Sequence, residues 1–65
     1  MRKKLIEQRK QQGFTQKSLA KKIGISRSTI AAYERGLITP SLGVCLKIKE
    51  ALSYLDDDLF CDTNK

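Results

Sequence analysis

The stretch Gln16–Arg35, QKSLAKKIGISRSTIAAYER, decides the fold of this chain. It predicts two short helices joined by one sharp turn, the first over residues 16–23 and the second from residue 27 to about residue 34. Gly24 stands at the break, where a residue without Cβ adopts a left-handed backbone at no steric cost. A tight pair of this kind presents its second helix as a rod that fits the major groove of duplex DNA.

Both predicted helices begin with the same local pattern. Thr15 and Ser26 are suitable N-caps, because a side-chain oxygen can accept a backbone N–H of the first turn that has no partner within the helix. The apolar residue before each cap lies five residues before another apolar residue, which is the spacing of a hydrophobic staple, in the pairs Phe14–Leu19 and Ile25–Ile30.

Further helices flank this pair. Residues 2–12 are rich in helix formers and end at Gly13, whereas Pro40 cannot continue a helix and Ser41 can cap the next one. After Ser41, apolar residues recur at helical spacing and predict a fourth helix that ends near residues 53–54. They are Leu42, Cys45, Leu46, Ile48 and Leu52, with Val44 widening the apolar stripe. The acidic residues 56–58 stand where a last, short helix with Leu59 and Phe60 could begin.

The inner side of the central pair is apolar and small enough for close packing. We expect a shared core from five of its residues: Leu19, Ala20, Ile23, Ile30 and Tyr33. The predicted fold class is therefore all-α, a compact bundle of four to five helices that contains a helix-turn-helix over residues 16–35. The length of 65 residues predicts a single domain over residues 1–65.

The positive charge of the chain is concentrated in its first half. Residues 1–35 hold ten lysines and arginines against two acidic residues, whereas residues 36–65 hold three lysines against five acidic residues. The formal net charge is +6. This asymmetry suits a polyanion bound to one face, although solvated helix faces would give a similar pattern.

Several functional classes are disfavoured by composition. The chain has no histidine and no CxxC pair, so a zinc site lacks ligands, and no metal or other cofactor is expected. The sequence does not decide whether Cys45 and Cys61 form a disulfide. We find no nucleophile–base pair that predicts an enzyme. There is no signal-peptide apolar region and no stretch of about 20 apolar residues, so we expect a cytoplasmic protein that does not enter a membrane.

The outer face of the second helix is the candidate for reading bases. Arg27 could donate two hydrogen bonds to O6 and N7 of guanine, a pairing worth about 1–3 kcal/mol of discrimination. Ala31 and Ala32 would let the helix enter a groove and could touch a thymine methyl group. The predicted base contacts are Ser26, Arg27, Ser28, Ala31 and Ala32. The alternative is an ordinary exposed helix face.

Phosphate contacts are expected around this face. Gln16 begins the first helix of the pair, where its amide and the helix N-terminus could hold a phosphate oxygen. The other predicted phosphate contacts are Lys17, Lys21, Thr29 and Arg35, although any one lysine could equally be solvated charge. Arg9 and Glu34 could form an ion pair between the first and third helices, or could be separate surface charges.

Residues 16–35, and more loosely residues 2–60, resemble the phage Cro and repressor family of helix-turn-helix proteins, the XRE-type regulators. The matching positions are Arg9, Gly13, Thr15, Gln16, Leu19, Ala20, Gly24, Ser26, Ile30, the run Tyr33–Gly36, and the run Pro40–Leu42. The resemblance implies a lambda repressor-like fold of four or five helices that binds operator DNA as a homodimer.

The resemblance also assigns roles to individual positions. Gln16 falls on a phosphate-binding position, Arg9 and Glu34 fall on a buried structural ion pair, and four residues fall on base-reading positions: Ser26, Arg27, Ser28 and Ala32. Residues 37–39 depart from the family pattern, where many relatives carry basic or amide residues, and this puts phosphate contacts from the loop in doubt. The dimer contact would come from Leu55, Leu59 and Phe60, unless these residues only close the core.

The functional hypothesis is a transcriptional regulator that binds double-stranded DNA sequence-specifically. It would act as a repressor, bound as a homodimer to a palindromic operator with half-sites roughly one turn apart. One alternative is an antitoxin whose main partner is a toxin protein, bound through Leu37 and Ile38 or through the C-terminal apolar residues. Another is a basic protein that binds nucleic acid, including RNA, without sequence preference.

Overall fold

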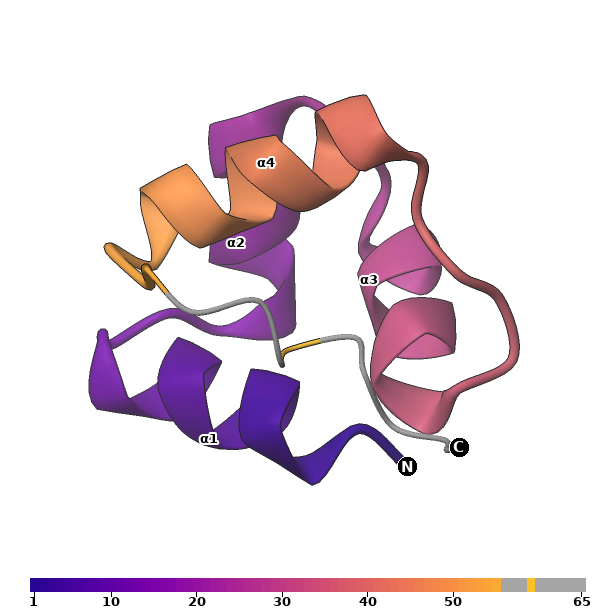
Figure 1. Cartoon of the computed structure of the whole chain (residues 1–65), viewed down its shortest axis with the longest axis horizontal. Coiled ribbons are helices and arrows are strands. Elements are labelled where there is room, and N and C mark those ends of the chain that lie inside the picture. The colour runs from indigo at the N-terminus through magenta and orange to yellow at the C-terminus, as the bar shows by residue number, and fades with distance from the viewer. Residues whose placement is uncertain (56–58, 60–65) are drawn as a thin grey trace.

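The computed structural model describes residues 1–55 and residue 59. This part of the chain is all-helical, which confirms the predicted fold class. Its four helices are α1 (Lys3–Gln11), α2 (Gln16–Ile23), α3 (Arg27–Arg35) and α4 (Leu42–Ala51). Helix α2 packs against both α3 and α4, and α1 packs against α3 (Figure 1). The last short helix predicted from the sequence falls, apart from Leu59, outside the described residues.

The ends of the two central helices are set by their local sequence, as predicted. The Thr15 side chain accepts a hydrogen bond from the backbone N–H of Ser18 at 3.0 Å, and the Ser18 hydroxyl accepts one from the backbone N–H of Thr15 at 2.9 Å. Ser26 accepts from the backbone N–H of Thr29 at the start of α3. Gly24 ends α2 with φ of 80°, in the left-handed region where glycine avoids the strain that a Cβ would bring.

The core lies where the four helices and Leu59 meet. It consists of Leu5, Leu19, Ala20, Ile23, Ile30, Tyr33, Ile48, Leu52 and Leu59. All five residues that were expected to form the inner side of the helix pair belong to it, so that prediction is confirmed. Phe14 and Ile25, the residues that precede the two caps, pack against the same cluster.

Helix α4 departs from the predicted pattern. Ile48 and Leu52 are fully buried, but Leu42 is 76% exposed and Leu46 is 54% exposed, so only part of the apolar stripe faces the core. The physical reason is that α4 packs mainly on α2 and has one covered side, whereas its apolar residues extend around more of the helix than one neighbour can cover. Val44 and Cys45 lie at the edge of the covered side and are half-buried.

Two basic side chains point into the molecule. Arg2 is 4% exposed and Arg9 is also buried, so neither adds its charge to an outer face. The positive surface of the first half is therefore carried by the other eight lysines and arginines of residues 1–35. Within the described residues, no helix has the length and the apolar character needed to cross a membrane.

Candidate nucleic-acid interface

The accessible side of α3 contains the residues predicted to contact bases. Ile30, Tyr33 and Glu34 are buried, because α3 packs on α2 and α1. With 3.6 residues per turn, the remaining side of the helix spans an arc of about 140°. This arc holds Arg27, Ser28, Ala31, Ala32 and Arg35, of which the two alanines are half-buried and the others exposed.

The Ser26 hydroxyl at the start of α3 is hydrogen-bonded to two neighbouring hydroxyl groups. The Ser26 hydroxyl lies 2.7 Å from that of Thr29 and 3.1 Å from that of Ser28, in addition to its bond from the Thr29 N–H. A base contact by Ser26 would therefore compete with its role as a cap. Arg27 makes no hydrogen bond or ion pair with any described residue, so its guanidinium remains available to a ligand at the beginning of the helix.

The predicted phosphate-binding residues lie around this face. Lys17 and Lys21 are exposed, and their spacing of four residues puts them on one side of α2. Thr29 is half-buried and bonded to Ser26. The Gln16 side chain is held in place, because its Nε2 donates a hydrogen bond of 3.0 Å to Oε1 of Glu34.

Glu34 is the centre of a buried polar network. The Arg9 guanidinium meets both of its carboxylate oxygens, with Nε 2.5 Å from Oε2 and Nη2 3.4 Å from Oε1. Nη1 of Arg9 also donates to the carbonyl oxygen of Phe14 at 2.8 Å. With Gln16, this network joins α1, the start of α2 and α3. It also buries and neutralises Glu34, the only acidic residue of α2 and α3.

Arg2 is a structural residue that sequence reasoning missed. Its backbone N–H and its guanidinium donate hydrogen bonds to the end of α3 and to the loop that follows. From the sequence, Arg2 is only one of ten basic residues that could face a polyanion. Nothing in the local sequence distinguishes it from Lys3 and Lys4, because its acceptors come from residues more than thirty positions away.

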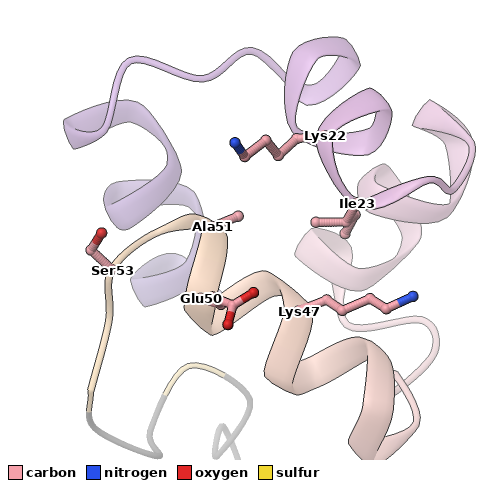
Figure 2. Close-up of a pocket in the computed structure, with 6 residues that line it drawn as sticks. All are labelled: Lys22, Ile23, Lys47, Glu50, Ala51 and Ser53. Carbon is pink, nitrogen blue, oxygen red and sulfur yellow. The ribbon is translucent and has the colours of Figure 1, made fainter.

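A surface hollow of about 540 Å³ lies between α2 and α4, away from the outer face of α3. It is lined by Lys22, Ile23, Lys47, Glu50, Ala51 and Ser53 (Figure 2). Figure 2 shows the side chains of Lys22 and Lys47 extending in opposite directions, so their ammonium groups do not converge on one anion. The described residues also hold no group of three or more side chains suited to bind a metal ion.

The residues suggested for the dimer contact are not equivalent. Leu55 is 93% exposed. Leu59 is 1% exposed and belongs to the core, which fits the alternative role of closing the core. Its dimer contact stays a prediction. Phe60 lies outside the described residues.

Comparison with known proteins gives matches over most of the chain. The model of the helix-turn-helix family matches residues 5–59. YgzD, an uncharacterized HTH-type transcriptional regulator of Bacillus subtilis, is 40% identical over 60 residues, which cover 92% of this chain and 91% of that protein. MJ0272, a regulator of the same description from Methanocaldococcus jannaschii, is 42% identical with coverages of 92% and 91%.

A third relative, an uncharacterized HTH-type transcriptional regulator of Archaeoglobus fulgidus, is 42% identical over 92% of this chain and 86% of its own length. No solved structure matches the chain significantly. The capped helix pair, the family match over residues 5–59 and these three relatives agree: the chain belongs to the XRE-type helix-turn-helix family.

Proposed function

We propose that this protein is a transcriptional regulator that binds double-stranded DNA sequence-specifically and represses by occupying a palindromic operator as a homodimer. The observation that carries the proposal is that the exposed charged side chains of α2 and α3 are all positive. Five basic side chains of these helices are exposed, Lys17, Lys21, Lys22, Arg27 and Arg35, whereas their single acidic residue is buried against Arg9. The descriptions of the three relatives as transcriptional regulators support the same function.

The shape of α3 supports entry into the major groove. Ala31 and Ala32 have small side chains, so the middle of the outer face of α3 can approach the bases closely. Arg27 is the first residue of α3, and its guanidinium is available to a ligand. In this proposal Arg27 reads a guanine, and the alanines contact thymine methyl groups or pass a base pair closely. Ser28 reads an adjacent base, and Ser26 contributes mainly by capping the helix.

Phosphate contacts fix the helix in the groove without reading sequence. We assign this role to Gln16 at the N-terminus of α2, to the exposed Lys17 and Lys21, to Thr29, and to Arg35 at the end of α3. A symmetric dimer would place its two copies of α3 about 34 Å apart, one turn of the DNA helix, and the half-sites of the operator would have the same spacing.

Selection from random duplex DNA at near-physiological salt tests the proposal. We expect a palindromic consensus with two half-sites about one turn apart. Arg27→Ala should relax the preference at one base pair in each half-site. Lys21→Ala should weaken binding to all sequences alike, and it should reduce the slope of the logarithm of the binding constant against the logarithm of the salt concentration by about 2, because one phosphate contact is lost from each protomer of the dimer. Equal losses on specific and random DNA for both variants would contradict this division of roles.

An antitoxin function is the second candidate, with a toxin protein as the main partner and DNA binding for autoregulation. The observation in its favour is the exposure of large apolar side chains on α4 and on the loop before it: Leu37, Ile38, Leu42 and Leu46. Co-purification of a stoichiometric protein from the native host would support it. A chain that purifies alone and forms only homodimers would count against it.

A further inference from the structure

We propose that Arg2 is a positioning residue for DNA binding, which holds the end of α3 and the following loop so that Arg35 is presented to a phosphate. The proposal rests on the proposed function, because it concerns the same DNA-binding face. Arg2 itself is buried, and we assign it no contact with DNA.

Four hydrogen bonds join Arg2 to the segment at the end of α3. Its backbone N–H donates to the carbonyl oxygen of Glu34 at 2.7 Å. Its Nη1 donates to the carbonyl oxygens of Tyr33 and Ile38, both at 2.7 Å, and its Nη2 donates to the hydroxyl of Thr39 at 3.0 Å. One residue before α1 therefore binds the last turn of α3 and the loop after it at the same time.

These acceptors are groups that a helix end leaves in need of a partner. The last carbonyl groups of a helix have no donor within it, and they carry the partial negative charge of the helix dipole. Gly36, with φ of 80°, turns the chain back, and the N–H of Leu37 bonds to the carbonyl oxygen of Ala32 at 3.0 Å. The segment from Tyr33 to Thr39 therefore folds around the guanidinium of Arg2.

Arg35 points outward from this turn. Arg35 follows Arg27 and Ala31 at intervals of four residues, so it lies on the outer side of α3, about 12 Å along the axis from Arg27. The residue before it and the two residues at positions 38 and 39 are bonded to Arg2. Arg35 thus sits on a turn whose backbone is fixed from the inside, while its side chain is exposed.

Without the guanidinium of Arg2, the last turn of α3 would fray more readily, and a phosphate contact by Arg35 would have to order that turn on binding. Ordering one long side chain with its backbone corresponds to a loss of roughly 2- to 10-fold in affinity. The loss should depend on Arg35, because the other phosphate contacts lie on α2 or at the start of α3.

A double-mutant cycle in DNA binding tests the proposal. Arg2→Met removes the guanidinium and keeps an unbranched stem, and Lys3→Met is the matched control, since it removes one positive charge from the neighbouring exposed residue. Each variant is measured on the selected operator and on a random duplex, at a temperature where thermal melting shows it to be folded. We expect Arg2→Met to weaken binding to both duplexes roughly 2- to 10-fold more than Lys3→Met does.

In an Arg35→Ala background, Arg2→Met should not lower the affinity for DNA any further. Arg2→Lys, in the wild-type background, should keep part of the affinity that Arg2→Met loses. Thr39→Val, which removes only the acceptor of Nη2, is a milder variant for the case in which Arg2→Met does not fold, and it should show the same dependence on Arg35. The proposal is overturned if Arg2→Met matches Lys3→Met, or if its loss is equal with and without Arg35.

The two proposals fail in different ways. Wild-type protein that binds both duplexes equally would overturn sequence-specific regulation, yet the cycle on the random duplex would still decide the role of Arg2, because phosphate contacts carry no sequence information. A wild-type protein that binds neither duplex would overturn both proposals.

Discussion

The buried pair of Arg9 and Glu34 allows a quantitative prediction about stability. Arg9 makes hydrogen bonds to both carboxylate oxygens of Glu34, and both side chains lie within the fold. Removing one partner of a buried pair leaves the other charge without compensation, which costs about 3–5 kcal/mol. A domain of this size has a total free energy of unfolding of roughly 3–10 kcal/mol, so either single change should remove a large part of it.

The perturbation is a cycle of Arg9→Met, Glu34→Leu and the double variant. Each single variant should lose about 3–5 kcal/mol, whereas the double variant should return to within about 2 kcal/mol of wild type, because neither buried charge remains. Two bonds are not restored in the double variant, the one to the Phe14 carbonyl oxygen and the one from Gln16 Nε2. At about 1 kcal/mol each, they set the expected remaining deficit.

Urea denaturation followed by circular dichroism measures these values. With a slope of about 1 kcal/mol per molar urea for so small a protein, a loss of 3 kcal/mol lowers the midpoint by about 3 M. Single variants that lose less than about 1 kcal/mol would refute the reasoning, because the pair would then be no stronger than an exposed one. A double variant that loses the sum of the two singles would refute the assumed coupling.

Three further changes test the local structure by the same denaturation measurement. Gly24→Ala should cost about 1–2 kcal/mol from the left-handed backbone alone, since a Cβ at this position meets no atom within 4 Å; a neutral result would contradict the strain. Ser26→Ala should cost about 1 kcal/mol by removing the cap of α3. Leu46→Ala should change the free energy of unfolding by less than about 0.5 kcal/mol, because Leu46 is exposed. Ile48→Ala on the same helix should lower it by about 2–5 kcal/mol, because Ile48 is buried. Equal losses would contradict the difference in burial between these two residues.

The two central helices were predictable because their signals act over a few residues. Thr15, Ser26 and Ser41 each cap the helix that follows, and each accepts a backbone N–H only three residues ahead. Gly24 interrupts the helical pattern between two caps, so both ends of α2 and the start of α3 follow from sequence alone. The outer face of α3 followed from the same helical period, once its apolar side was assigned to the core.

Local sequence thus determined where α2 and α3 begin, where α2 ends and which side of each is buried. Only the tertiary structure decided where Arg2 and the leucines of α4 go. The guanidinium of Arg2 finds its acceptors 31 and 36 residues away, and a basic side chain shows no sign of them in its own surroundings. Leu42 and Leu46 stay exposed because α4 has one principal neighbour, α2, and apolar character alone does not tell which part of a helix surface will be covered.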